Sequence, residues 1–447
     1  MDVKGTIDSL LPEYLTIFKE LVAINSVAAT NLDGCVEAAE YLRGLLRDRG
    51  FKVELWGGYG SPVVHASIDG DGDPFFIYNH YDVQPPDPLD RWRSDPFKLS
   101  RDGDKLVGRG VADNKGNIVA RLMAIDLFRE RYGDYPIEWI IEGEEEVGSP
   151  NLERILVEHR SEIRGGSGLW ETGYVRRDGR LEFPLGYKGM VYLEVEVSTL
   201  LSDSHSGYAP ILPNPFTILA EKILDLKDSN GVLKKGFLVE GVSREYIEMA
   251  SEMLEEIPPS VVEETLELYG VPKSMWIAPE TAIERLYLNP SINVSGFKAG
   301  YILEGSKTIV PSKAVAKIDF RPLPGQNVDH ILNMLKRHFA EGLEGGVRIK
   351  VYGKYRSGYT RRDAKIVGVA VDAGVEAYGK PPLVTPISPG SGPIYLFTDL
   401  LGIELAGAGV GYYGSRAHAP NENIRVDDFK NGVYHVYRML ERYFGAV

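Results

Sequence analysis

Cysteine is nearly absent from this sequence of 447 residues, in which Cys35 is the only one. One thiol cannot form an intramolecular disulfide, and zinc sites built on paired cysteines need more thiols than this chain has. Any metal site must therefore use histidine, aspartate and glutamate. Histidine is also scarce, with eight in the chain, so the position of each one is informative.

The sequence also lacks an excess of positive charge and any long apolar run. It has 50 basic and 64 acidic residues, a net charge of −14 and a pI of about 5.2. This balance argues against nucleic-acid and anionic-membrane partners, because phosphates bind clusters of lysine and arginine. No stretch approaches the ~20 apolar residues of a membrane span, and the first residues do not resemble a secretion signal. We therefore expect a cytoplasmic protein with no nucleic-acid or membrane partner.

The length exceeds what one hydrophobic core usually supports, so two domains are expected. Residues 1–185 alternate strand and helix patterns, and residues 356–447 return to this alternation. The pattern predicts an α/β domain with a mostly parallel sheet flanked by helices. Residues 186–355 show a βαββαβ order instead, which predicts an inserted α+β domain. A largely helical insertion near residues 227–288 is expected within it.

The segment FFIYNHYDVQPP ends an apolar strand at His80, and Asp82 follows two residues later. In open α/β sheets, ligands bind at the carboxyl ends of the strands. An imidazole that binds a metal usually donates its second N–H to an acceptor such as a carboxylate, which Asp82 is placed to provide. A lone HxD pair is more often a surface turn, so this hypothesis needs further ligands.

Carboxylates and one more histidine occupy comparable positions. Asp113 lies at the start of a predicted helix and follows a glycine-rich segment. The simpler interpretation of this aspartate is an N-cap of the helix. Glu145 and Glu146 follow an apolar strand ending in WII, and Glu171 ends the short strand GLWETG. Strict alternation would place Glu145 and Glu146 on opposite faces, so both can face one site only if the strand breaks there. His418 lies in a polar loop before the last helix.

A pair of divalent ions with one bridging carboxylate needs this inventory of two histidines and several carboxylates. The charges of these residues are also compatible with a pair of divalent ions. Two divalent ions bring four positive charges, and Asp113, Glu146 and Glu171 subtract three, so a bound hydroxide would leave the site neutral.

Six motifs occur in the order of a known family: YNHYDVQP, GRGVADNKG, EGEEEVGS, DSHSGYAP, IVPSKAVAKIDFRPLPGQ and AHAPNENI. Over essentially its whole length the chain resembles the dinuclear zinc metallopeptidases, which include aminoacylases, carboxypeptidase G, acetylornithine deacetylase, succinyl-diaminopimelate desuccinylase and carnosinase-like cytosolic dipeptidases. The resemblance implies a zinc-exopeptidase-like catalytic domain and a ferredoxin-like inserted domain that serves as a lid or in dimerisation. It further implies a homodimer and two divalent metal ions, with zinc favoured and cobalt or manganese as alternatives.

The resemblance also implies a full ligand set for the two ions. Asp113 would bridge both ions, and a cis peptide bond would follow it. The other ligands fall into one pair for each ion: His80 with Glu171, and His418 with Glu146.

Three further residues receive catalytic roles from the resemblance. Glu145 would be the general base on a water between the ions, and Asp82 would orient His80. His205, in the inserted domain, would reach across a dimer interface and stabilise the oxyanion.

Substrate-binding candidates lie in the second half of the chain. Arg321 is a candidate for bidentate contact with a substrate carboxylate, and a salt bridge at a strand end is an equally good interpretation. Backbone N–H groups of the loop containing Ser388, Gly390, Ser391 and Gly392 are candidates for the same ligand.

The expected function is metal-dependent hydrolysis of an amide bond in a small peptide or an N-acyl amino acid. The large insertion and the EGEEEVGS form resemble the dipeptidase branch, whereas Glu171 resembles the aminoacylase and carboxypeptidase G branches. A dipeptidase or carboxypeptidase is favoured, and an N-acyl-amino-acid deacylase is the alternative. A catalytically silent binding or assembly protein is the alternative of another class, and the filled ligand positions argue against it.

Overall fold

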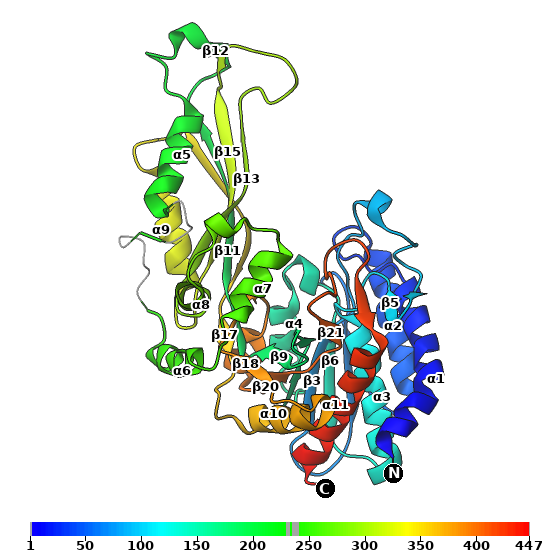
Figure 1. The fold of residues 1–447 in the computed structure, drawn as a ribbon. Coiled ribbons are helices and arrows are strands. Elements are labelled where there is room, and N and C mark those ends of the chain that lie inside the picture. The colour runs from blue at the N-terminus through cyan, green and yellow to red at the C-terminus, as the bar shows by residue number, and fades with distance from the viewer. Residues whose placement is uncertain (1, 229–232, 235–240, 447) are drawn as a thin grey trace. The chain divides into compact units, whose positions relative to one another are not determined.

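The computed structural model describes residues 2–228, 233–234 and 241–446 (Figure 1). The chain divides into two compact units. Unit 1 comprises Met1–Leu185, Thr360–Thr385 and Pro393–Val447, and unit 2 comprises Gly186–Tyr359 and Pro386–Gly392. The return to unit 1 therefore lies four residues later than the expected start at residue 356. Residues 386–392 cluster with unit 2, not with the first domain as expected, because β19 (Ser388–Ser391) pairs with β10 (Gly186–Lys188).

Unit 1 is built on a six-stranded mixed sheet. Three of its five strand pairs are parallel, and the two antiparallel pairs lie at one edge. All residues of the third and fourth strands are buried, as expected for central strands covered on both faces. In spatial order the strands are β1 (Lys52–Trp56), β2 (Val63–Ile68), β6 (Ile137–Glu142), β3 (Phe75–His80), β7 (Ser167–Trp170) and β20 (Glu404–Gly407).

Helices and two small sheets complete unit 1. Helix α11 packs on α1, α3 and α10, and α1 also packs on α3. Helix α2 packs against β1 and β2. The helices are α1 (Val3–Ala23), α2 (Leu32–Arg47), α3 (Lys115–Tyr132), α4 (Leu152–Glu158), α10 (Lys365–Tyr378) and α11 (Val426–Phe444). One small sheet has the order β18 (Leu383–Thr385), β9 (Leu181–Pro184), β8 (Tyr174–Val175) and β21 (Gly411–Tyr412), and the other β22 (Asn423–Arg425), β5 (Lys105–Val107) and β4 (Ser100–Asp102).

Unit 2 contains an antiparallel sheet with the order β13-β15-β11-β16. With its two helices the unit follows the βαββαβ order expected from the sequence. Burial alternates along β11, so one face of the sheet packs on the apolar sides of the helices. The elements in chain order are β11 (Met190–Ser198), α5 (Pro215–Leu226), β13 (Ser291–Ala299), β15 (Lys313–Arg321), α9 (Val328–Ala340) and β16 (Val347–Tyr355).

Residues 227–288, expected to be a helical insertion, contain three α-helices in their described part: α6 (Arg244–Leu254), α7 (Ser260–Leu268) and α8 (Pro279–Tyr287). Residues 229–232 and 235–240 lie outside the described residues. Ser243 caps α6, because its hydroxyl accepts the N–H of Tyr246 at 3.3 Å. The Tyr246 hydroxyl then donates to the Tyr287 carbonyl at 2.5 Å and ties α6 to α8. Unit 2 also contains β12 (Ser204–His205), β14 (Ile309–Val310) and β17 (Gly358–Tyr359).

Among the described helices, none combines the length and apolar character needed to cross a membrane.

Candidate metal centre

His80 is the last residue of β3 and is fully buried. Its Nε2 lies 3.0 Å from Asp113 Oδ1, and its Nδ1 lies 3.1 Å from the Asp82 carbonyl oxygen and 3.3 Å from Asp82 Oδ1. An N–H at Nδ1 would leave Nε2 free to bind a metal. Asp82 thus contacts the imidazole nitrogen that the sequence hypothesis required.

Asp113 contacts both histidines that were expected to be ligands. Its Oδ1 lies 3.0 Å from His80 Nε2, and its Oδ2 lies 3.0 Å from His418 Nε2. The peptide bond between Asp113 and Asn114 is cis, as the resemblance implied. One carboxylate therefore presents each oxygen to a different imidazole, which is the arrangement needed to bridge two ions.

The strand that carries the acidic run ends early enough to bring both expected glutamates to one side. β6 ends at Glu142, and a short 3₁₀ turn covers Glu145–Val147. Asp82 stabilises this turn, because its carboxylate accepts the backbone N–H groups of Glu145 and Glu146 at 3.2 and 3.0 Å. The strand therefore ends before Glu145, which meets the condition stated for both glutamates to face one site.

The remaining two carboxylates lie beside the histidines. Glu146 Oε2 is 3.2 Å from His418 Nε2 and accepts the side-chain N–H of Gln84 at 2.9 Å. Glu171 follows β7 directly, and its Oε2 is 3.6 Å from His80 Nε2. Each histidine therefore has Asp113 on one side and one glutamate on another, in the pairs expected from the sequence.

The donor set fits divalent cations in two respects. Two ligand atoms bound to one zinc at about 2.0–2.1 Å are roughly 3.3 Å apart at the tetrahedral angle, and the separations at both histidines lie close to this value. In addition, Glu146 Oε1 and Glu171 Oε2 are buried without a hydrogen-bond partner among the described residues. Buried carboxylate oxygens are costly to leave unpaired, and a cation would compensate that cost. Asp113, Glu146 and His418 each offer a ligand atom within 4.8 Å of the others.

The electrostatics of the cluster also favour a cation. Burial opposes ionisation of Asp113, but hydrogen bonds from His418 and His80 outweigh it and lower its pKa. Hydrogen bonds with Asp113 and Glu146 raise the pKa of His418 to about 11. Burial raises the pKa of Glu171 to about 8, and the charges of Asp113 and Glu146 add to the shift. The negative charges thus draw protons to the positions where metal ions would bind.

Glu145, the expected base, lies next to this cluster. Burial and the charge of Glu171 raise its pKa, and Glu146 and Asp113 contribute in the same direction. A carboxylate with a raised pKa is better suited to take and return a proton near neutral pH.

A buried arginine that sequence reasoning missed holds the strand ends together. Arg121 of α3 donates to the carbonyl oxygens of Tyr78, Trp170 and Ala408 at 2.6, 2.6 and 2.9 Å, and to Asn79 Oδ1 at 2.6 Å. These acceptors lie in or next to β3, β7 and β20. No local pattern marks this residue, because it lies in the middle of an apolar helix.

Glu422 was also missed, although it belongs to the motif AHAPNENI. Its fully buried carboxylate accepts the N–H groups of Gly110, Ala112 and Asp113 at 3.1, 2.8 and 3.0 Å, and pairs with Arg109 at 2.7 Å. The loop after His418 therefore fixes the backbone that carries Asp113.

The substrate-binding candidates Arg321 and Ser391 lie in unit 2 and contact each other. Arg321 donates to Ser391 Oγ at 2.6 Å and pairs with Asp319 at 3.1 Å. Arg321 therefore forms a salt bridge at the end of β15, and the same side chain also contacts the loop that was expected to bind substrate. In that loop Ser388 Oγ accepts the N–H of Gly390 at 3.1 Å, and Gly392 is the last residue of the segment that belongs to unit 2.

His205 lies in β12 of unit 2, whereas the metal ligands lie in unit 1. Its Nδ1 accepts the N–H of Gly207 at 3.0 Å. The other histidines have structural surroundings or are exposed to solvent. For example, His65 pairs with Glu138 at 3.1 Å, and His435 is buried in α11.

Two histidines and three carboxylates lie together in unit 1, and two of the carboxylates have a buried oxygen with no hydrogen-bond partner among the described residues. This arrangement is a candidate site for divalent metal. The family model described as peptidase family M20/M25/M40 matches residues 76–442. The chain belongs to this family.

Individual relatives agree with this assignment. The M20 family metallo-carboxypeptidase Sso-CP2 from Sulfolobus solfataricus is 34% identical, with a TM-score of 0.88 over 96% of this chain and 99% of that chain. Human Beta-Ala-His dipeptidase is 31% identical over 296 residues, which cover 63% of this chain and 56% of the human protein. Cys-Gly metallodipeptidase DUG1 of Candida albicans is 25% identical over 460 residues, covering 96% of this chain and 94% of that protein. The family recognised from the motifs is confirmed, and with it the use of divalent metal.

Proposed function

We propose that the protein is a dinuclear metallopeptidase that hydrolyses the amide bond of dipeptides or of the C-terminal residue of small peptides. The observation that carries this proposal is the Asp113 carboxylate, whose two oxygens lie 3.0 Å from His80 Nε2 and from His418 Nε2. The relatives named as dipeptidases and as a carboxypeptidase support the choice of substrate class.

In this proposal His80 and Glu171 hold one ion, His418 and Glu146 hold the other, and Asp113 is shared. Zinc suits this set of nitrogen and oxygen ligands, and cobalt or manganese could replace it. When bound, two such ions polarise the substrate carbonyl and make a water molecule more acidic.

Glu145 performs the proton transfers. Its carboxylate takes the proton of the attacking water and delivers it to the nitrogen of the leaving amine. Burial raises the pKa of Glu145, which helps the carboxyl group to retain that proton until the amide C–N bond breaks. Asp82 supports this step indirectly, because it binds the backbone N–H of Glu145 and contacts His80.

Arg321 and the loop of Ser388, Gly390, Ser391 and Gly392 are proposed to bind the substrate carboxylate. Arg321 is held by Asp319 and Ser391, so its guanidinium is oriented before substrate arrives. Such preorganisation reduces the entropy lost on binding.

A substrate panel tests the proposed function. The protein would be loaded with zinc, cobalt or manganese and assayed on dipeptides, on N-acetyl amino acids and on N-succinyl amino acids with the same C-terminal residue. We expect dipeptides to be cleaved with the highest kcat/KM. Faster cleavage of the N-acyl substrates would instead establish a deacylase, and no turnover with two ions bound would establish a silent protein.

We further propose that the protein acts as a homodimer formed through unit 2. Large apolar side chains around β12 and β14 are exposed: Leu201 fully, Ile211 at 77% and Leu303 at 73%. Exposed apolar patches of this kind mark interaction sites. His205 of β12 would then complete the metal site of the partner by stabilising the oxyanion.

Mixed dimers test this arrangement. Subunits with His205→Ala and subunits with Glu145→Gln should each be inactive alone, and mixing should restore part of the activity because one site in the mixed dimer is intact. A monomeric protein with full activity would contradict the proposal.

A further inference from the structure

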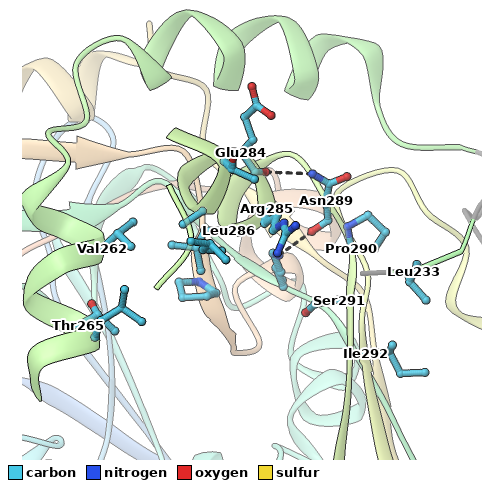
Figure 2. A pocket seen from close by; sticks show the side chains of 16 residues that line it. Leu233, Val262, Thr265, Glu284, Arg285, Leu286, Asn289, Pro290, Ser291 and Ile292 are labelled. Atoms are coloured by element: carbon cyan, nitrogen blue, oxygen red, sulfur yellow. Dashed lines mark hydrogen bonds between the residues drawn. The ribbon is translucent and has the colours of Figure 1, made fainter. Parts of the chain in front are cut away.

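A cavity of about 500 Å³ lies within unit 2, between α7, α8 and the start of β13 (Figure 2). All of its lining residues belong to unit 2, whereas the metal ligands belong to unit 1. Its lining is mainly apolar, with side chains such as Val262, Leu266, Leu286 and Ile292. Its volume is within the range of small-molecule binding pockets, roughly 300–1,000 Å³.

Two cationic side chains line this apolar cavity. Lys188 is 2% exposed, and its Nζ donates to the carbonyl oxygen of Asn289 at 2.8 Å, the one hydrogen-bond acceptor it has among the described residues. Arg285 is half-buried, and its side chain has no hydrogen bond or ion pair to another described residue. Arg285 lies next to Asn289 in the close-up view (Figure 2), and Asn289 is also the residue to which Lys188 donates.

The cavity offers these cations no carboxylate. Glu284 is the one acidic residue in the lining, but it is exposed and its carboxylate points away from the other labelled side chains (Figure 2). The side-chain amide of Asn289 is already engaged with the Glu284 carbonyl oxygen at 3.2 Å. The lining therefore combines excess positive charge with apolar walls.

Such a combination calls for an anion. An ammonium group with one acceptor leaves N–H groups unsatisfied in a desolvated site, which costs free energy unless a counter-charge is present. Burial, together with the positive charge of Arg321, lowers the pKa of Lys188 to about 7. A ligand carboxylate would supply both the missing acceptors and the missing charge.

We propose that this cavity binds a small amphipathic carboxylate, with the carboxylate between Lys188 and Arg285 and the apolar body against α7 and α8. Two classes of compound have a carboxylate on an apolar body of this size: medium-chain fatty acids and acylated apolar amino acids. None of the lining residues is a metal ligand or the proposed base, although Pro389 belongs to the loop proposed to bind the substrate carboxylate.

Calorimetric titration of the metal-loaded wild-type protein tests this site, with octanoate and N-acetylleucine as the two carboxylate probes and 1-octanol as the neutral one. We expect at least one carboxylate to bind at least tenfold more tightly than octanol, and the tighter of the two identifies the source. Equal affinity for octanoate, N-acetylleucine and octanol would overturn the proposal.

Variants locate the binding. Lys188→Met keeps the length of the side chain and removes its charge, and Leu266→Trp fills the cavity without changing a charge. Each substitution should lower the affinity for the tighter-binding carboxylate at least tenfold. The control substitution Lys336→Met, at an exposed position of α9, should leave this affinity unchanged. If both cavity variants bind the probe like wild type, the carboxylate binds elsewhere, for example at the metal ions, and the proposal is wrong.

Discussion

The two sheets of this protein treat polar groups in opposite ways. In unit 2 the antiparallel sheet alternates buried apolar and partly exposed polar side chains along β11, and its ion pairs, such as Lys313 with Glu196, lie in solvent. In unit 1 the mixed sheet is buried along β3 and β6, and polar groups are buried where its strands end. His80 is fully buried there, and Glu171 is 5% exposed.

This difference shows that the buried polar groups with a high free-energy cost lie at the candidate functional site. Apolar burial accounts for the helix-facing side of the unit 2 sheet. The strand ends of the unit 1 sheet instead hold two glutamates, each with a buried oxygen that has no hydrogen-bond partner among the described residues. Such an arrangement is stable only when a cation compensates the charge. The stability of the strand ends in unit 1 should therefore depend on metal, and the stability of the unit 2 sheet should not.

Removal of metal should have the largest effect, and it should affect unit 1 and not unit 2. A chelator should abolish turnover and increase hydrogen exchange at the segments around Asp113, Glu146 and His418, because the carboxylates and histidines lose their shared partner. Exchange in β11 and β15 should stay unchanged, which provides an internal control. Mass spectrometry of peptides after exchange would measure both regions, and uniform loss of protection across both units would contradict the contrast.

Replacement of the base should come next in magnitude. Glu145→Gln should retain both metal ions and lower kcat by roughly 10²–10⁴-fold, because an amide cannot take a proton from water. Metal content and turnover would be measured together. Glu130→Gln, an exposed change on α3, is the matched control, and near-normal turnover of the Glu145 variant would exclude Glu145 as the base.

A change at Glu422 should have a smaller effect through Asp113. Glu422→Gln keeps the shape of the side chain but removes the charge that binds Arg109 and three backbone N–H groups. We expect metal affinity to fall about 10–100-fold, as for other residues that orient ligands. Excess metal should restore turnover if the role is to position Asp113. Glu37→Gln, exposed on α2, should not change metal affinity, and failure of excess metal to rescue turnover would argue for a purely structural role.

The smallest expected effect concerns His435, which is buried in α11 and bound to the Ala370 carbonyl oxygen at 2.9 Å. Burial lowers its pKa from 6.5 to about 4. Between these values the unfolded chain binds a proton that the folded chain does not, so stability falls as pH falls below 6.5. The loss between pH 7.5 and 5.5 should be about 1 kcal/mol.

Urea unfolding of wild type and His435→Leu at both pH values would measure this contribution. The Leu variant should lose this part of the pH dependence, whereas His330→Asn, at an exposed position of α9, should retain it. An unchanged pH dependence in the Leu variant would show that other groups cause it.

The parts of the site that follow from local sequence were predictable. His80 is the last residue of an apolar strand, and Glu146 and Glu171 each come after one. Parallel strands bring such positions to the same end of a sheet. The sequence also showed that Glu145 and Glu146 could face one site only if the strand ended before them, and β6 does end at Glu142.

Long-range contacts were not predictable in the same way. The carboxylate of Glu422 binds the N–H of Asp113 across 309 positions of sequence, and Arg121 joins strand ends that are distant in the chain. Residues 386–392 join unit 2 through pairing of β19 with β10, which no local pattern reveals. These features depend on packing of segments that the chain brings together only when folded.

The central claim is that the edge of the unit 1 sheet holds two ions that share Asp113. Anomalous diffraction from crystals grown with zinc tests it most directly. We expect two peaks roughly 3.5 Å apart, each within bonding distance of one Asp113 oxygen, with one peak beside His80 and the other beside His418. A single peak, or two peaks that do not share Asp113, would contradict the account.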